Sequence, residues 1–255
     1  MNKNNFTLAE PIILALDTSC KVTSFAVGRG GTLLKAISEL PDQKRSETLW
    51  TEVETLLADL GMTIGDVDVF SVCIGPGGFT GLRVGMAAVK GFSAATDKPL
   101  VGITSLEGAA FAASPAPAVC AILNAYKGEV YSQLFSFNGD EMPVAKNDPM
   151  VSTIASALER VSVEKELVFA GDGAEAAEED IRAAAESHDQ VNWRTYCSDR
   201  GLAIDIARLA FLKYGRGQTE TVEGLKACYV RPSEAEIKLS LGLLGSKIKR
   251  SMKSG

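Results

Sequence analysis

The sequence predicts an α/β protein made of two small domains, and three observations carry that prediction. Three strand-like runs open the chain, helical and strand-like segments then alternate, and a similar order of segments recurs after residue 114. The chain has 255 residues, of which 46% are hydrophobic and 23% charged. That length suits two domains of about 100 to 130 residues. A three-stranded meander that leads into alternating helices and strands indicates a duplicated ribonuclease-H-like unit.

The first half of the chain divides into three strands and then alternates helices with strands. Gly30-Gly31 marks the hairpin between the second and third strands. Thr104-Ser-Leu-Glu107 has the form of a capping box, which opens a helix. The expected ranges are strands 12–16, 22–28 and 32–37, helix 46–60, strand 67–74, helix 80–95, strand 100–103 and a helix from 104.

The second half repeats this order less clearly. Ser114-Pro-Ala-Pro117 is a candidate hinge, and Asn138-Gly139 is a turn signal after two paired strands. The expected ranges are strands 119–123 and 129–137, helix 152–160, strand 167–170, a helix after 173, strand 191–196 and helix 202–214. We expect a first domain at 1–104, completed by a C-terminal helix near 237–250, a second, smaller domain at 105–236, and a basic tail at 251–255.

The segment 73–90 joins an apolar strand, a glycine-rich turn and a helix that contains more glycine than ordinary packing needs. Gly81, Gly85 and Gly91 each cost the helix about 1 kcal/mol relative to alanine, which predicts that this helix exists for close contact with a second helix. Thr80 is placed to cap it. Two other interpretations stay open: a phosphate-binding turn, although neither the P-loop nor the dinucleotide pattern is complete, and a tight turn packed within one chain.

The turn after the first strand carries an acidic residue and two hydroxyls, Asp17, Thr18 and Ser19. Actin-like and sugar-kinase-like ATPases have an Asp-x-Gly-Thr turn there, whose glycine lets the backbone approach phosphate. Ser19 would crowd that approach. One hypothesis is therefore a vestigial nucleotide turn of a small ATPase or kinase, with Asn124 or Lys127 near the substrate, whose hydrolysis Asp17→Asn would reduce. The other is that these side chains hydrogen-bond the turn itself.

Several kinds of site are disfavoured by composition. His188 is the single histidine and lies in a polar run, so we expect neither a paired-histidine metal site nor a serine triad. The five cysteines are odd in number and include no Cys-x-x-Cys pair, which indicates free thiols in a reducing compartment. No signal-peptide core or membrane span is evident, so we expect a cytoplasmic protein.

The charge of the chain is unevenly distributed. A net charge of −6 argues against a nucleic-acid-binding surface on the main body. Five basic residues lie within the last 18 residues of the chain. This segment is either an electrostatic arm for RNA or a solvated terminus.

Five segments taken in order resemble the bacterial TsaB family, formerly called YeaZ, whose members are accessory proteins of threonylcarbamoyladenosine modification of tRNA. The most specific of them is Gly-Pro-Gly-Gly-Phe-Thr-Gly-Leu-Arg-Val-Gly at 75–85. The others are Ile13–Ser19, Arg45–Leu49, Asn124–Tyr131 and Tyr229–Glu236. The resemblance implies two actin-like (ASKHA) domains, the second reduced, and a scaffold that catalyses nothing itself, metallopeptidase activity included.

In that family TsaB pairs with TsaD, the transferase that modifies an adenosine beside the anticodon, and TsaE joins as an ATPase. The resemblance thus implies TsaD as the direct partner, TsaE and tRNA as indirect ones, and a homodimer when the chain is alone. It implies no cofactor of the chain's own, with ATP or ADP at the partner interface left open. Gly85→Leu is expected to block docking and leave the fold intact. The expected interface residues are Thr80, Gly81, Leu82, Arg83, Gly85, Met86, Ala87 and Lys90.

Overall fold

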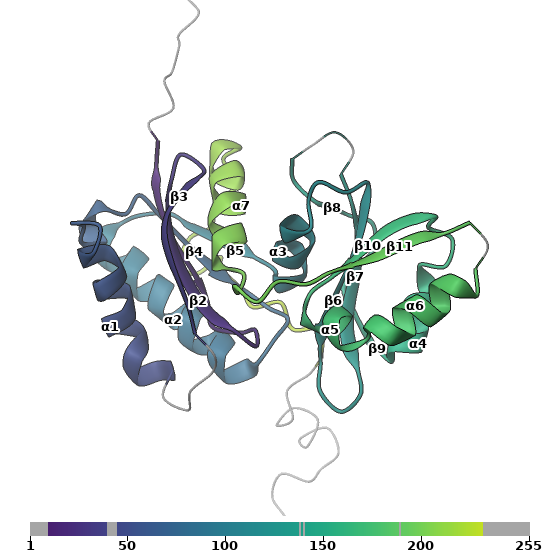
Figure 1. Cartoon of the computed structure of the whole chain (residues 1–255). Helices are drawn as coiled ribbons and strands as arrows, with labels where there is room; N and C mark the ends of the chain where they lie inside the picture. The colour runs from purple at the N-terminus through teal and green to yellow at the C-terminus, as the bar shows by residue number, and fades with distance from the viewer. Residues whose placement is uncertain (1–9, 40–44, 138, 140, 189, 232–255) are drawn as a thin grey trace, which may run out of the picture.

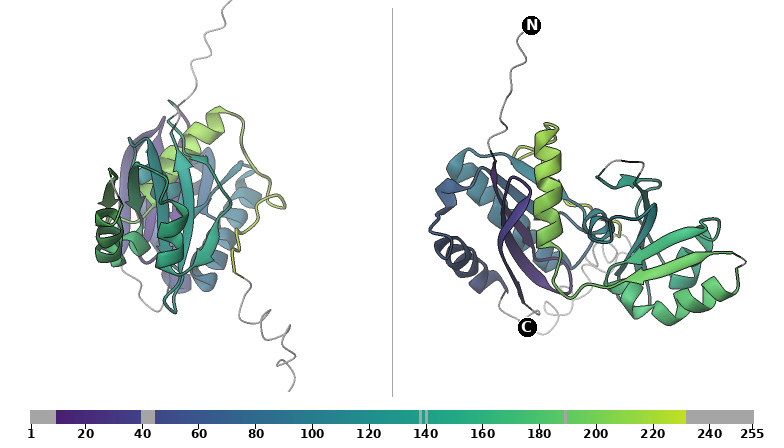
Figure 2. Two further views of the ribbon diagram at one scale, coloured as in Figure 1. Left: turned by 90° about the vertical axis from the view of Figure 1, so that its right-hand side faces the viewer. Right: turned by 45° about the horizontal axis from the view of Figure 1, so that its top comes forward.

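A computed structural model describes residues 10–39, 45–137, 139, 141–188 and 190–231, which form two α/β domains lying side by side (Figures 1 and 2). Each domain is a mixed β-sheet with helices on both faces. Within the described residues no helix is both long enough and apolar enough to cross a membrane.

The first sheet has the strand order β3-β2-β1-β4-β5. The strands are β1 (Ile12–Asp17), β2 (Thr23–Arg29), β3 (Thr32–Glu39), β4 (Val69–Cys73) and β5 (Leu100–Ile103). β1, β2 and β3 form the expected antiparallel meander, and β4 and β5 run parallel to β1. Because β4 pairs directly with β1, the ends of these two strands meet at one edge of the sheet.

Alternation of side chains along β1 supplies two separate cores. Leu14 and Leu16 face helices α1 (Arg45–Ala58) and α2 (Phe79–Thr96), whereas Ile13 and Ala15 face helix α7 (Ala203–Gly215). A strand that is apolar on both faces needs cover on both sides. The short 3₁₀ helix η1 (Ile64–Asp66) precedes β4.

The second sheet repeats the first in reduced form, with the order β11-β10-β6-β7-β8 and with β9 also paired to β7. Its strands are β6 (Ala118–Asn124), β7 (Val130–Ser136), β8 (Val144–Ala145), β9 (Met150–Ser152), β10 (Glu166–Ala170) and β11 (Asn192–Tyr196). β6 pairs with β7 antiparallel and with β10 parallel, just as β1 pairs with β2 and β4. Two short strands stand where the first sheet has the eight-residue β3, so the duplicated ribonuclease-H-like unit is confirmed.

The two domains exchange helices. α3 (Ser105–Ala112) follows β5 of the first sheet but packs on β6 of the second, and α7 follows β11 of the second sheet but packs on β1 and β2 of the first. Figure 1 shows both helices standing between the two sheets. The outer face of the second sheet is covered by α4 (Ile154–Arg160), α5 (Asp172–Ala176) and α6 (Glu178–Glu186).

This exchange corrects the domain boundary drawn from the sequence. The expected second domain, 105–236, includes α7, which covers the first sheet. The segment after α7 also returns to the first domain, since Leu225 lies in its core and Glu220 forms a β-bridge with Leu100. The reason is physical: without α7 the apolar side chains Ile13 and Ala15 would face water. The helix expected near 237–250 and the basic tail lie outside the described residues.

Candidate functional site

The turn that follows β1 is buried and hydrogen-bonded to its surroundings. Asp17, Thr18 and Ser19 are all buried, and Thr18 Oγ1 donates to the Gly81 carbonyl oxygen at 2.7 Å. Asp17 Oδ1 accepts from the backbone N–H of Ser19 at 2.9 Å and of Cys20 at 3.3 Å. These contacts are those of a turn that stabilises itself, the second of the two interpretations of this motif.

Within the described ranges, Asp17 nevertheless has one carboxylate oxygen whose hydrogen-bonding capacity is unused. Burial raises the pKa of its carboxyl above the ordinary value, and the hydrogen bonds from Ser19 and Cys20 partly oppose that rise. Its second oxygen, Oδ2, is buried with no hydrogen-bond partner among the described residues. A buried oxygen of this kind is uncommon in folded proteins and marks the turn as a candidate site.

The glycine-rich turn packs directly on the turn after β1. Gly78 N donates to the Ser19 carbonyl oxygen at 2.8 Å, and a Cβ added at Gly77 would lie 2.6 Å from that same oxygen. The Gly78 amide is thus already used within the chain. Of the interpretations left open by the sequence, the contacts of this turn favour tight packing within one chain over a phosphate cradle.

The structure divides the expected interface residues of α2 into two groups. Gly81, Leu82, Gly85 and Met86 are buried against the chain's own sheet. A Cβ added at Gly85 would overlap Thr18 Oγ1, so this glycine serves close approach within the chain. The expectation that Gly85→Leu leaves the fold intact is therefore wrong. So is the expected cap at Thr80, because the helix begins at Phe79 with Gly78 at the N-cap position.

The other expected residues do lie at the surface. Thr80, Arg83 and Ala87 are exposed, Lys90 is half-buried, and Gly91 one turn further is exposed, with nothing within 4 Å of an added Cβ. We call the surface formed by Trp50, Thr80, Arg83, Ala87 and Gly91 the α1–α2 face. Trp50 on α1 is 48% exposed and packs its ring 5.3 Å from that of Phe92 on α2. Sequence reasoning did not single out Trp50, because its position in the helical period puts it at the edge of the face that carries the buried Val53 and Leu57, where an apolar side chain reads as part of the core.

A second feature, absent from the sequence analysis, is a cavity of about 170 Å³ between the two domains. The turn after β1 supplies Cys20 and Lys21, and the second domain supplies Asp172, Glu175 and Asp199. Burial raises the pKa of the Asp172 carboxyl, which the charge of Lys21 partly opposes. Carboxylates outnumber the lysine among these charged residues, so the lining does not favour a polyphosphate chain.

The hairpin 124–131 contains Asn124 and Lys127, which the ATPase hypothesis placed near a substrate. Tyr126 and Lys127 at its tip have positive φ, and Tyr126 is 69% exposed. The ion pair at its base joins Glu129 to Arg231 from the C-terminal part of the described chain. Asn124 is the link to the interdomain cavity, because its backbone N–H donates to Asp172 Oδ1 at 3.0 Å.

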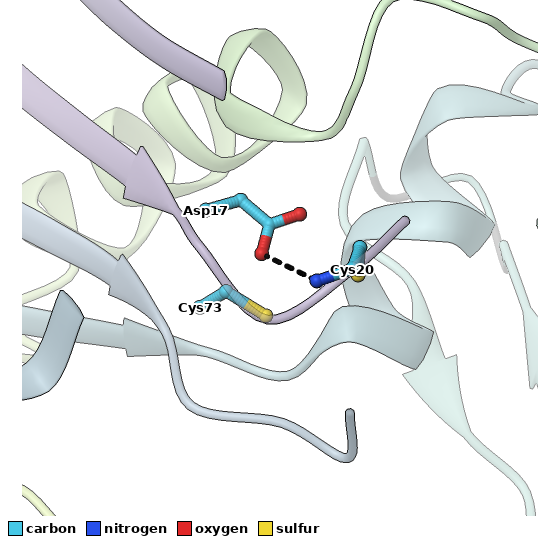
Figure 3. Close-up of side chains that lie close together, drawn as sticks. All are labelled: Asp17, Cys20 and Cys73. Atoms are coloured by element: carbon cyan, nitrogen blue, oxygen red, sulfur yellow. Dashed lines mark hydrogen bonds between the residues drawn. The ribbon is translucent and has the colours of Figure 1, made fainter. Parts of the chain in front are cut away.

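One cluster was missed by sequence reasoning altogether. Asp17, Cys20 and Cys73 each offer a potential ligand atom, and these three atoms lie within 4.8 Å of one another (Figure 3). The two cysteines are 53 residues apart and meet because β1 and β4 pair in parallel, with Leu16 opposite Val72. A correct strand pairing would have revealed the cluster, whereas a search for Cys-x-x-Cys or histidine pairs could not.

Comparisons with known proteins converge on one family. The family model described as TsaD, tRNA N6-adenosine threonylcarbamoyltransferase, matches residues 38–191, more than half of the chain. The Escherichia coli protein named "tRNA threonylcarbamoyladenosine biosynthesis protein TsaB" is 31% identical over 122 residues, covering 47% of this chain and 52% of that protein. The chain spans between about a third and a half of the length of the curated relatives it matches.

Solved structures extend the likeness over most of the chain. The structure titled "YeaZ from Pseudomonas aeruginosa" has a TM-score of 0.71 and 25% identity, covering 86% of this chain and 99% of that one. The ROK hexokinase from Thermus thermophilus, at 11% identity and a TM-score of 0.51, covers 81% of this chain and all of that one and shows the actin-like fold alone. The chain therefore belongs to the family of tRNA N6-adenosine threonylcarbamoyltransferases, TsaD, and within it to the TsaB (YeaZ) proteins.

Proposed function

We propose that the chain is a non-catalytic scaffold subunit in the synthesis of threonylcarbamoyladenosine on tRNA, and that it binds a TsaD transferase through the α1–α2 face. The observation that carries this proposal is the exposed side of α2, where the small residues Ala87 and Gly91 are open to solvent and the exposed ring of Trp50 packs on Phe92 of the same helix.

The composition of the α1–α2 face suits helix docking. Ala87 and Gly91 lie four residues apart on the exposed side of α2, so a second helix can approach its backbone closely. Trp50 offers a large, half-exposed aromatic ring of the kind that anchors protein interfaces. Arg83 and Lys90 flank the small residues and favour a partner with acidic groups at the rim.

The family relationship supports TsaD as the partner. The TsaD family model spans residues 38–191, which include α1 and α2. A TsaD transferase is thus expected to carry a related pair of helices, and two related faces can pair about an approximate twofold axis. The same reasoning allows two copies of this chain to pair when TsaD is absent, so a homodimer is expected for the isolated chain.

The scaffold role, rather than the ATPase alternative, is favoured by the turn after β1. Thr18 and Ser19 are buried, and Gly78 N and Gly81 O, which border them, are already hydrogen-bonded to that turn. We expect TsaE and tRNA to be reached through the transferase. A bound ATP or ADP at the shared interface stays a prediction. The five free cysteines fit a reducing compartment, and we propose the cytoplasm.

The test is size-exclusion chromatography with light scattering on the chain mixed with the TsaD of the same organism. Ala87→Arg places a long charged side chain on the α1–α2 face and is expected to weaken the heteromeric complex at least about tenfold. Ala183→Arg, at an exposed position of α6 in the second domain, is the matched control and should leave the complex unchanged.

A tRNA threonylcarbamoylation assay with the remaining components completes the test. Modification should depend on the chain and fall with Ala87→Arg. If Ala87→Arg and Ala183→Arg form the complex equally well, the α1–α2 face is the wrong surface. If modification proceeds at full rate without the chain, the scaffold function itself is wrong.

A further inference from the structure

Four polar atoms meet where the turn after β1 touches the end of β4. Ser19 Oγ lies 3.0 Å from Asp17 Oδ1, 3.1 Å from Cys73 Sγ and 3.9 Å from Cys20 Sγ. The atoms offered by Asp17, Cys20 and Cys73 are themselves within 4.8 Å of one another. Figure 3 shows the carboxylate and the two thiol side chains around one small space.

These separations approach those of a tetrahedral metal site. With zinc–sulfur bonds of about 2.3 Å and zinc–oxygen bonds of about 2.1 Å, neighbouring ligand atoms lie about 3.4 to 3.8 Å apart. The three distances from Ser19 Oγ, 3.0, 3.1 and 3.9 Å, lie just below and just above that interval. The ligand atoms of Asp17, Cys20 and Cys73, which lie within 4.8 Å of one another, would have to move slightly closer together to bind one ion. Two sulfur ligands and a carboxylate select a thiophilic ion over Mg²⁺ or Ca²⁺, which prefer oxygen ligands alone.

One oxygen of the Asp17 carboxylate is available to a ligand at this cluster. The Asp17 carboxyl is fully buried and its Oδ2 has no partner within the described part of the chain. A bound cation would give this buried oxygen a partner.

A route to the cluster exists as well. Cys20 is half-buried and forms part of the wall of the interdomain cavity, beside Lys21. An ion entering this cavity meets Cys20 first, whereas Cys73 and Asp17 lie deeper and are buried.

We propose that Asp17, Cys20 and Cys73 bind one thiophilic divalent metal ion of the Zn²⁺ class, with the Ser19 hydroxyl or a water molecule as the fourth ligand. Each coordinating thiol loses its proton to solvent as the metal–sulfur bond forms. The ion would fasten the turn after β1 to the end of β4, at the junction of the two domains. This inference does not depend on the TsaD partner proposed above.

The experiment uses the full chain without a polyhistidine tag, reduced and stripped of metal with a chelator. Zn²⁺ is titrated in competition with a chromophoric chelator, and Co²⁺ is used as a spectroscopic probe. We expect one equivalent of Zn²⁺ per chain and, with Co²⁺, the intense visible bands and thiolate charge-transfer absorption of a tetrahedral sulfur-containing site. Zn²⁺ should also raise the melting temperature, because it binds the folded chain.

Three variants make the assignment specific. Cys20→Ala and Cys73→Ala should each weaken Zn²⁺ binding by more than about tenfold, since even outer-shell partners of a metal ligand are worth about 10 to 100-fold. Cys120→Ala removes a strand cysteine of the second domain that is buried like Cys73, and this variant should bind Zn²⁺ as the unaltered chain does. Because Cys20 is only half-buried, Cys20→Ala is expected to fold, and its metal-free melting temperature verifies this.

The proposal is overturned if the reduced chain binds no stoichiometric Zn²⁺, or if Cys20→Ala binds it as tightly as Cys120→Ala does. A weak Co²⁺ spectrum without thiolate charge transfer would also exclude it. None of these results bears on docking to TsaD, which the chromatography of Ala87→Arg tests separately.

Discussion

Individual glycines of α2 have opposite surroundings although the sequence presents them alike. Gly85 faces Thr18 and Val72 within the chain, whereas Gly91 faces open space. Composition and spacing alone predict a helix built for close contact. Which glycine contacts the chain itself and which lies free depends on the strand that passes beneath the helix, and a helical period alone does not contain that information.

The first prediction concerns these two glycines. Gly85→Ala should lower the free energy of unfolding by about 1 to 3 kcal/mol, because the added methyl overlaps the Thr18 hydroxyl that bonds Gly81. Gly91→Ala should raise it by up to about 1 kcal/mol, since alanine favours the helix and meets nothing there. Denaturant unfolding of the isolated chain measures both. Equal effects of the two substitutions would contradict the surroundings assigned to them.

Whole elements were the most predictable level of this structure. Each strand and helix expected within the described residues is present, with ends that differ by a residue or two, because hydrophobic periodicity and turn residues mark them locally. The capping box before α3 is half realised. Thr104 Oγ1 accepts from Glu107 N at 3.0 Å, but the Glu107 carboxylate pairs with Lys213 of α7 at 2.9 Å. Lys213 belongs to α7, which packs on the other domain's sheet, and the local sequence around Glu107 does not predict this contact.

The first turn of α7 carries a pH-dependent contact. Asp205 is buried and accepts two hydrogen bonds from Arg200, both at 3.0 Å, yet burial outweighs the nearby arginines and raises its pKa to about 6. The folded chain therefore holds this proton more tightly than the unfolded chain does. Its contribution to the free energy of unfolding falls as pH rises from about 4 to about 6.

The prediction compares the unaltered chain with Asp205→Asn, which cannot titrate. The free energy of unfolding of the unaltered chain, relative to the variant, should fall by about 2 to 3 kcal/mol between pH 4 and pH 7. Urea unfolding at several pH values measures this difference. Asp199→Asn, at an exposed position nearby, is the control. A difference that stays constant with pH, or grows, would contradict a raised Asp205 pKa.

At the scale of the molecule, the exchange of α3 and α7 makes the two domains interdependent. The duplicated order of strands was predictable, because both halves show it in the sequence. The boundary at 104 and 105 was not, because it assumed that each sheet is covered by helices from its own stretch of chain. Ile13 and Ala15 instead meet Ala203 and Ile206, nearly 200 residues later. Such pairings depend on how the two sheets are placed, and the order of segments along the chain does not specify that.

The last prediction separates the two proposed ways of completing the first domain. A chain ending at residue 201 lacks α7 and leaves one face of the first sheet exposed, so it should lose the cooperative unfolding transition. A chain ending at residue 231 keeps α7 and Leu225 in the core, and should unfold in one transition with a midpoint close to that of the full chain. Circular dichroism during denaturant unfolding compares the three. If the chain ending at 231 is as unstable as the one ending at 201, then the segment near 237–250 completes the first domain and α7 does not suffice. If both shortened chains match the full chain, neither helix is needed, and burial of Ile13 and Ala15 is not what unites the two domains.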